Sequence, residues 1–107
     1  MADKTISLAI TEDQFEKQVK HLASLFDWEY YHTWKSYHSP AGFPDCVLVN
    51  PELQRTIFAE LKSETGQPSP DQYLWLVALT EAGNKEVYLW RPSDFDEVAK
   101  ILRGDSI

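Results

Sequence analysis

The sequence predicts an α/β fold in which a small mixed β-sheet is flanked by helices. Two observations lead to this fold class. Capping signals followed by apolar residues at helical spacing mark helices, and short apolar or aromatic runs between turn residues mark strands. The predicted elements follow in the order α-β-β-β-α-β-α along a chain of 107 residues. That length predicts a single domain over residues 1–107.

The first helix is predicted over residues 12–26, after a loose leader or edge segment at residues 1–9. Thr11 and Gln14 have the spacing of a capping box, in which the threonine side chain caps the helix and the glutamine reaches back. Apolar residues then recur along one helical face: Phe15, Val19, Leu22, Ala23 and Phe26. The cap and the periodicity together predict where this helix begins and which side it buries.

Three strands are predicted to follow the first helix. Residues 28–34 are rich in aromatic side chains and read as a strand, whereas residues 35–42 contain Ser, His, Pro and Gly and read as a loop. Residues 45–49 and 56–62 are short apolar strands, and a turn begins between them at Asn50. Because these two strands are close in sequence, we expect them to form an antiparallel hairpin.

The second helix is predicted to begin after Ser69, which forms a capping box with Gln72 and is followed by Pro70 at the first helical position. Gly83 is a natural C-terminal cap for this helix. Residues 86–90 then read as the fourth strand. We expect this strand–helix–strand unit to be a right-handed crossover between parallel strands.

The last helix is predicted to start at the Ser93-x-x-Asp96 signal and to end at Gly104. Its apolar positions follow the helical period: Phe95, Val98, Ala99 and Leu102. This helix completes the predicted order of elements.

Composition and charge limit the classes of function. Hydrophobic residues make up 43% of the chain and charged residues 25%, as in soluble globular proteins. The sequence contains neither a signal peptide nor an apolar run of the ~20 residues that a membrane helix needs, so a cytoplasmic protein is predicted. The single cysteine, Cys46, lies in an apolar run and is expected to be a buried, inert thiol.

The net charge of −7 argues against tight, metal-free and non-specific DNA binding, because nucleic-acid binders usually present a basic face. A nuclease tolerates an acidic chain when its carboxylates hold metal ions and its basic residues gather near the cleft. The charge therefore restricts, but does not exclude, a nucleic-acid substrate.

The most specific feature is the placement of Asp45 relative to Glu60, Leu61 and Lys62. Alternate residues of a strand share a face, so Glu60 and Lys62 point the same way, about 7 Å apart, while Leu61 faces the other side. Asp45 begins the preceding strand, and in a hairpin the start of one strand lies beside the end of the next. We therefore expect Asp45, Glu60 and Lys62 to meet at one end of the sheet.

These residue types suit metal-assisted phosphodiester hydrolysis. Mg²⁺ prefers oxygen ligands and usually takes one or two carboxylates together with water and substrate phosphate. A nearby lysine orients or deprotonates the attacking water and offsets developing charge. The alternative is an ordinary Glu-x-Lys ion pair on a solvated strand and a Pro-Asp turn. The combination of both motifs at hairpin spacing favours the catalytic interpretation.

With these residues in view, the chain resembles the PD-(D/E)XK nuclease superfamily and, within it, the small stand-alone VRR-NUC domains of bacteriophages. The matching segments run in family order: Thr11–Phe15, Tyr31–Thr33, Gly42–Asp45, Glu60–Lys62, Ser69–Gln72 with Trp75, and Val87–Pro92. The Pro44-Asp45 and Glu60-x-Lys62 motifs are moderately specific alone. The added Gln72-x-x-Trp75 and Trp90-Arg91-Pro92 segments make the resemblance strong.

The resemblance implies a restriction-endonuclease-like core, similar to Holliday-junction resolvases, that uses Mg²⁺ or Mn²⁺. It implies that Asp45 and Glu60 are metal ligands, that the Leu61 carbonyl completes the set, and that Lys62 is the catalytic lysine. It also places Gln72 near the active site.

Superfamily members often add a glutamate from the first helix. Glu12 fits that position best, because it lies one turn before the inward-facing Phe15. Glu16, one turn further along the same face, is the second choice. Either residue is alternatively a solvated carboxylate that favours a helix N-terminus.

Several further residues are candidates for DNA contacts. His32 lies in a matched segment and is a candidate to touch a phosphate or the attacking water, although a partly exposed polar residue is the simpler interpretation. Lys35 and His38, with Tyr37, lie on the following loop and are candidate backbone contacts. Trp28, Trp34, Trp75 and Trp90 are expected in the core or an interface rather than as stacking platforms.

Two classes of function follow from these observations. The first is a metal-dependent DNA endonuclease that prefers a junction, flap or nick, leaves a 5′-phosphate and a 3′-hydroxyl as the family does, and acts as a homodimer. The second is a catalytically silent nuclease-fold module that binds DNA ends or a protein partner. The acidic charge favours the second function, and the complete set of Asp45, Glu60, Lys62 and Gln72 favours the first.

Overall fold

A computed structural model describes residues 4–34 and 37–105. Four strands form one sheet in the order β1-β2-β3-β4. Their bounds are Glu29–His32 (β1), Cys46–Asn50 (β2), Arg55–Leu61 (β3) and Glu86–Trp90 (β4). β1 pairs with β2 and β2 with β3 in antiparallel fashion, whereas β3 and β4 are parallel. The predicted mixed sheet, its hairpin and its parallel pair are confirmed.

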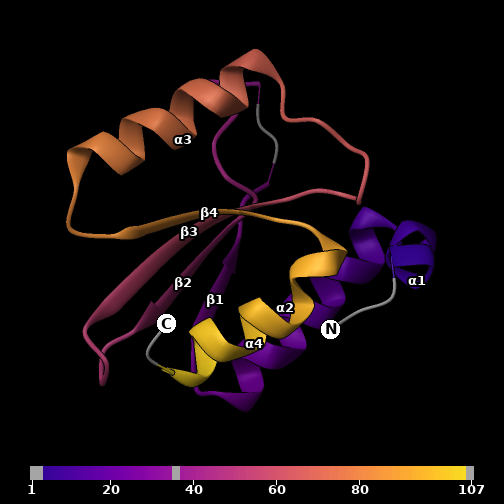
Figure 1. The fold of residues 1–107 in the computed structure, drawn as a ribbon. Coiled ribbons are helices and arrows are strands. Elements are labelled where there is room, and N and C mark those ends of the chain that lie inside the picture. Colours follow the sequence, from indigo (N-terminus) through magenta and orange to yellow (C-terminus); the bar gives the residue numbers. More distant parts are fainter. Residues whose placement is uncertain (1–3, 35–36, 106–107) are drawn as a thin grey trace.

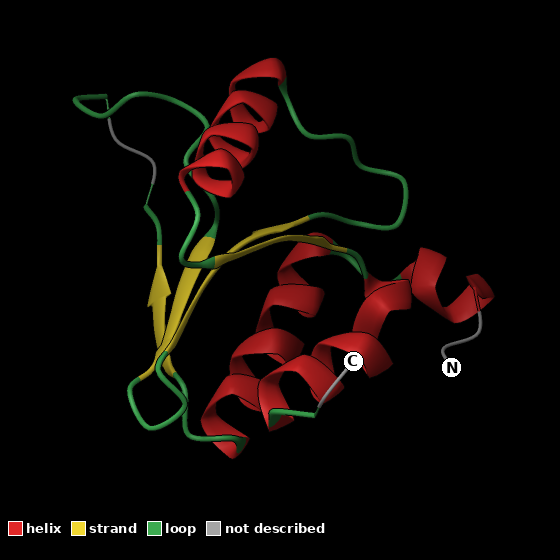
Figure 2. Cartoon of the chain, turned by 60° about the vertical axis from the view of Figure 1, so that its left-hand side comes forward, coloured by secondary structure: helices red, strands yellow, loops and turns green. Residues whose placement is uncertain are grey.

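Helices cover both faces of the sheet (Figures 1 and 2). α2 (Glu12–Leu25) and α4 (Phe95–Arg103) lie together on one face, and α3 (Pro70–Ala82) lies across the other. The predicted order α-β-β-β-α-β-α therefore describes the chain from α2 to α4. Among the described residues, no helix combines the length and apolar character needed to span a membrane.

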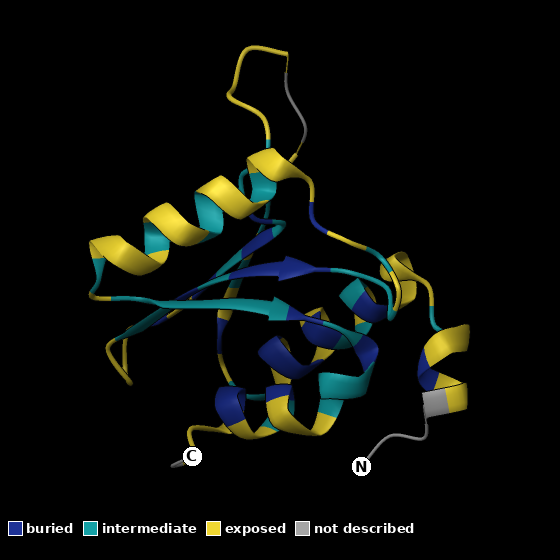
Figure 3. Cartoon of the chain, turned by 45° about the horizontal axis from the view of Figure 1, so that its top comes forward, coloured by how far each residue is buried: buried dark blue, intermediate teal, exposed yellow. Residues whose placement is uncertain are grey.

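The hydrophobic core lies between the sheet and the α2/α4 pair. It is built from alternate residues of the strands and from one face of each helix: Phe15, Val19, Leu22 and Ala23 of α2, Cys46, Leu48, Ile57, Ala59 and Leu61 of the sheet, and Val98, Ile101 and Leu102 of α4. By contrast, α3 contains no buried residue. Figure 3 shows this difference, with buried positions gathered on α2, α4 and the strands.

Both predicted capping boxes form. Thr11 Oγ1 accepts a hydrogen bond from the Gln14 N–H (3.1 Å), and Gln14 Oε1 accepts one from the Thr11 N–H (2.9 Å). Ser69 and Gln72 repeat the exchange at the start of α3, with distances of 3.2 and 2.8 Å. At each of these helix starts, one N–H group that lacks an intrahelical partner is thus paired where the sequence predicts.

The N-terminal segment differs from the expected loose leader, because Lys4–Ala9 forms a short helix, α1. α1 packs against the turn after β4, and its Ser7 is fully buried, whereas Ile6 and Leu8 remain exposed. Six residues are too few to display a helical period, so this helix depends on a tertiary contact that local sequence does not reveal.

The start of α4 also differs from the prediction. A 3₁₀ turn, η1 (Pro92–Asp94), precedes the helix, and Asp94 rather than Ser93 occupies the cap position. Asp94 Oδ2 accepts a hydrogen bond from the Arg91 N–H (2.9 Å), while the Ser93 N–H donates to Glu64 Oε1 (3.0 Å). A contact with a distant loop therefore replaces the predicted local cap.

The four tryptophans divide into two groups. Trp28 and Trp90 are buried in the core and Trp75 is half-buried against Phe43, but the Trp34 side chain is 80% exposed. Trp34 is therefore not a core residue, and its alternative position in an interface stays a prediction. Cys46 is fully buried as predicted, and burial raises the pKa of its thiol to about 12.

Candidate active site

The register of the β2/β3 hairpin brings Asp45 beside Glu60. Cys46 lies opposite Ala59, so the next pair outward is Asp45 and Glu60. Asp45 Oδ2 also accepts a hydrogen bond from the Leu61 N–H (2.8 Å), which satisfies a donor at the end of β3. This contact fixes the Asp45 carboxylate at the end of the sheet where β3 delivers Glu60 and Lys62.

Glu60 is fully buried at the centre of this cluster. Its Oε2 accepts a hydrogen bond from Gln72 Nε2 (2.8 Å) and lies 3.4 Å from Lys62 Nζ. Its Oε1 is buried and has no hydrogen-bond partner among the described residues. Burial raises the pKa of Glu60 to about 8, and the charge of Asp45 adds to the rise while Lys62 opposes it.

Gln72 is held at both ends of its amide group. Oε1 accepts from the Ser69 N–H as part of the capping box, which directs Nε2 toward Glu60. The local signal that starts α3 therefore also positions a site residue.

Lys62 supplies positive charge to the cluster. Its side chain is only 14% exposed, and its ammonium group balances part of the buried negative charge.

Gly42 allows the loop before Asp45 to approach α3 closely. Its φ is +95°, and a Cβ there would lie 2.5 Å from the backbone carbonyl carbon of Asp71. The adjacent Phe43 ring packs edge-on against Trp75 of α3 and Phe58 of β3, with ring centroids 5.1 and 5.9 Å apart. These contacts hold the loop that carries Asp45 against the helix that carries Gln72.

A comparison with protein-family models matches residues 3–90 to the VRR-NUC domain. The chain belongs to the VRR-NUC family. This family implies a nuclease-type function, and the match extends from α1 through β4, so it includes every element that contributes to the cluster at Glu60. No curated protein matches the chain.

The two candidate carboxylates on the first predicted helix of this VRR-NUC domain, Glu12 and Glu16, have different surroundings in the structure. Partial burial raises the pKa of Glu12, the charge of Lys62 opposes that rise and the charge of Asp45 adds to it, so Glu12 lies within electrostatic reach of the cluster. Glu16 instead turns toward β1, where its Oε2 accepts from the Tyr30 hydroxyl (2.9 Å) and His32 Nδ1 (2.5 Å). Glu12 is therefore electrostatically coupled to Asp45 and Lys62, whereas the Glu16 carboxylate is engaged in hydrogen bonds with β1.

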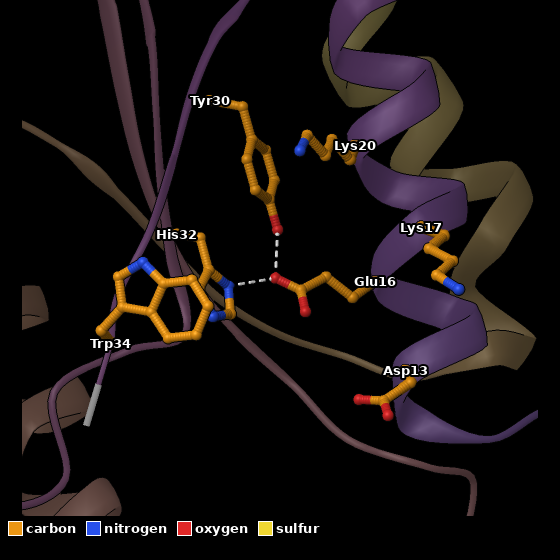
Figure 4. Close-up of a pocket in the computed structure, with 7 residues that line it drawn as sticks. All are labelled: Asp13, Glu16, Lys17, Lys20, Tyr30, His32 and Trp34. Atoms are coloured by element: carbon orange, nitrogen blue, oxygen red, sulfur yellow. Dashed lines mark hydrogen bonds and ion pairs between the residues drawn. The ribbon is translucent and has the colours of Figure 1, made fainter.

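The predicted DNA-contacting residues lie in different settings. His32 lies on β1 opposite Cys46 and lines a pocket between α2 and β1, where Glu16 engages its ring (Figure 4). His38 is exposed in the loop that leads to Asp45. Lys35 lies outside the described residues. The pairing of Glu16 with Tyr30 and His32 was not predicted, although Tyr30 and His32 occupy alternate positions of one strand and so share a face.

The donor set suits a hard divalent cation. Asp45 and Glu60 supply two neighbouring carboxylates, and the buried, unpartnered Oε1 of Glu60 is an acceptor that a cation would satisfy. No group of three or more His, Cys, Asp or Glu side chains gathers as a metal cluster in the part of the chain that the structure describes. Two carboxylates completed by water and substrate phosphate match the usual coordination of Mg²⁺ in proteins.

Proposed function

We propose that this VRR-NUC domain is a Mg²⁺- or Mn²⁺-dependent endonuclease of the PD-(D/E)XK type that hydrolyses DNA phosphodiester bonds. One observation carries the proposal: Glu60 is fully buried, shares one oxygen with Gln72 and Lys62, and has no donor for its other oxygen although the Asp45 carboxylate lies next to it. Burying a carboxylate oxygen without a hydrogen-bond partner costs free energy unless a ligand binds to it. A structural ion pair would not require that arrangement.

Each residue of the cluster has a role in this proposal. Asp45 and Glu60, with the Leu61 carbonyl, hold the cation, which when bound supplies Lewis-acid stabilisation of the charge that builds on the phosphate. Gln72 fixes the orientation of the Glu60 carboxylate. Glu12 extends the negative surface of the cluster from α2.

Lys62 orients the attacking water and offsets negative charge in the transition state. The water oxygen forms a new bond to phosphorus in line with the departing 3′ oxygen, and the water releases a proton to solvent. The bond between phosphorus and that oxygen breaks, and the 3′ oxygen takes a proton from solvent. The products are a 5′-phosphate and a 3′-hydroxyl.

The substrate that we propose is structured DNA, such as a junction, flap or nick. With a net charge of −7, the chain has little capacity to hold long duplex DNA through phosphate contacts alone. A homodimer would place two such sites on paired strands. The exposed apolar side chains of α3 are candidates for its interface: Tyr73, Leu74 and Val77.

A panel of nicked, flapped, branched and fully paired DNA, incubated with Mg²⁺ or Mn²⁺, tests this function. We expect cleavage that requires the metal, stops in EDTA and favours the structured substrates. Intact DNA in every lane would contradict the endonuclease proposal and favour the silent binding module. Calorimetry distinguishes the two independently, since Mn²⁺ should bind the wild type and bind Asp45→Ala much more weakly.

A further inference from the structure

A recess lies between α2 and β1. This α2–β1 pocket has a volume of about 330 Å³ and is lined by Asp13, Glu16, Lys17, Lys20, Tyr30, His32 and Trp34 (Figure 4). The proposed chemistry at Asp45 and Glu60 uses none of these residues. Its volume is at the lower end of small-ligand pockets, which suits a single nucleotide rather than a base pair.

We propose that the α2–β1 pocket receives one unpaired nucleotide of the DNA strand that is being cut. The inference rests on the proposed nuclease function and narrows its substrate class to DNA with a single-stranded segment next to the cleavage point. Three features of the pocket carry it: an exposed indole, a fixed polar floor and two lysines on its rim.

Trp34 supplies the stacking surface. Its side chain is 80% exposed, yet its ring makes an edge-on contact with the His32 ring, with centroids 4.8 Å apart and planes at 80°. An indole that is held by a neighbouring ring and is still 80% exposed has surface available for base stacking, which tolerates any sequence. A base that stacks there must first leave its own duplex, so a paired strand cannot use the pocket without local melting.

The floor of the pocket is held by Glu16. Because a carboxylate accepts only, the Tyr30 hydroxyl (2.9 Å) and His32 Nδ1 (2.5 Å) both donate to Glu16 Oε2. This arrangement fixes the orientation of the imidazole. His32 Nε2 makes no hydrogen bond with another described residue, so it is open to a phosphate or base of the bound nucleotide.

Lys17 and Lys20 supply positive charge on the rim. Neither lysine forms an ion pair within residues 4–34 and 37–105, and both come from the α2 face that borders the pocket. In Figure 4 the Lys20 side chain extends toward Tyr30. In a chain of net charge −7, two unpaired lysines next to a candidate nuclease site favour contact with a strand's phosphates.

The end of β1 and the helix α2 both connect the pocket to the cluster of Asp45 and Glu60. Thr33, the residue after His32, donates its N–H to the carbonyl oxygen of Asp45 (2.9 Å). On α2, Glu12 precedes Glu16 by four residues, a rise of about 6 Å. A strand with its phosphate at Asp45 and Glu60 can therefore place a neighbouring nucleotide against Trp34 and α2.

Fluorescence anisotropy in EDTA tests the pocket without cleavage. The probes are a blunt duplex and the same duplex with an unpaired tail. We expect the wild type to bind the tailed probe more tightly and Trp34→Ala to weaken that binding by about 5- to 100-fold, as expected for the loss of one stacked base. Tyr31→Ala is the matched control, because Tyr31 is also exposed but points to the opposite face of β1.

Charge is tested separately with the double variant Lys17→Gln/Lys20→Gln. Its affinity for the tailed probe should depend less on salt, with the log–log slope reduced by roughly 1 to 1.5, whereas Lys100→Gln on α4 should leave the slope unchanged. Thermal unfolding verifies that all variants remain folded.

Two results would overturn the proposal that the pocket binds an unpaired nucleotide. One is equal affinity of the wild type for the two probes, and the other is an equal loss of affinity in Trp34→Ala and Tyr31→Ala.

The same experiments distinguish failure of the pocket proposal from failure of the nuclease proposal. Trp34-dependent binding without metal-dependent cutting would retain the pocket and reject the endonuclease, while cutting with no role for Trp34 would do the reverse.

Discussion

The two faces of the sheet differ in what they bury. Alternate residues of β3 show the contrast, because Ile57 and Ala59 are completely buried under α2 and α4, whereas Phe58 is only half-buried beneath α3. Glu60 is the exception on the α3 side, since it is a fully buried carboxylate. The α2/α4 face therefore supplies most of the apolar burial, and the α3 face carries a buried carboxyl group that folding alone would not favour.

The difference between the two faces explains how a small chain tolerates the free-energy cost of burying Glu60. The core under α2 and α4 is apolar and continuous, so it does not depend on the α3 face for burial. At Glu60 the cost is reduced by Gln72 and Lys62 rather than by apolar packing. Substitutions on the two faces should consequently separate stability from activity.

The largest expected effect on stability lies in the α2/α4 core. Phe15→Ala should lower the free energy of unfolding by about 3–5 kcal/mol, because it leaves a cavity under α2. Leu74→Ala on the outer side of α3 should change it by no more than about 0.5 kcal/mol. Urea unfolding at concentrations where the midpoint is independent of chain concentration measures both. Similar losses for the two variants would remove the distinction between the faces.

Glu60 should behave in the opposite way to a core residue. Burial raises the pKa of Glu60 to about 8, so at neutral pH the folded chain holds a proton on a side chain that is ionised in the unfolded chain. Glu60→Gln removes this cost, and in EDTA we expect the free energy of unfolding to rise by about 1 kcal/mol. Mn²⁺ should raise the melting temperature of the wild type but not of Glu60→Gln. A variant that is strongly destabilised in EDTA, and still stabilised by Mn²⁺, would mean that Glu60 is a structural residue.

A smaller, pH-dependent effect is expected from the ion pair between Arg55 and Glu86. Arg55 donates from Nε and Nη2 to the two Glu86 oxygens (2.6 Å each) and from Nη1 to the Ile101 carbonyl (2.9 Å), which ties β3 to α4. The Arg55 hydrogen bonds lower the pKa of Glu86 below its ordinary value. A lowered folded-state pKa stabilises the fold above about pH 4.5, and that contribution is lost as the pH falls through the folded-state value.

Glu86→Gln should therefore cost about 0.5–1 kcal/mol at pH 7, since the pair is partly exposed, and much less near pH 3. Unfolding of the variant and the wild type at both pH values measures the difference. Glu81→Gln, at an exposed position of α3, is the control and should have little effect at either pH. A deficit that stays constant or grows on acidification would contradict the assigned role of this pair.

The sequence predicted those features that depend on local signals. The capping boxes at Thr11 and Ser69 fixed two helix starts, and hairpin geometry anticipated that Asp45 and Glu60 would be neighbours. Strand alternation likewise anticipated the approach of Lys62 to Glu60. These relations span a few residues or one tight connection, so spacing alone is sufficient to predict them.

Features that depend on distant contacts were missed. α1 forms against the turn after β4, and Glu64 pairs with the backbone of Ser93, which displaces the predicted helix cap. The choice between Glu12 and Glu16 stayed open in the sequence, because it depends on the position of β1 relative to α2. The exposure of Trp34 also depends on that packing. An aromatic residue near a strand does not indicate whether a helix will cover its side chain.

Cleavage by Lys62→Ala, compared with Lys100→Ala, tests the central claim most directly. Both variants remove one lysine, but only Lys62 contacts the buried Glu60. On a structured DNA substrate with Mn²⁺, we expect Lys62→Ala to lose about 10²- to 10⁴-fold in rate while its circular dichroism spectrum is unchanged, and Lys100→Ala to cut like the wild type. Undiminished cutting by a folded Lys62→Ala would show that the cluster at Asp45, Glu60 and Lys62 is not the catalytic site.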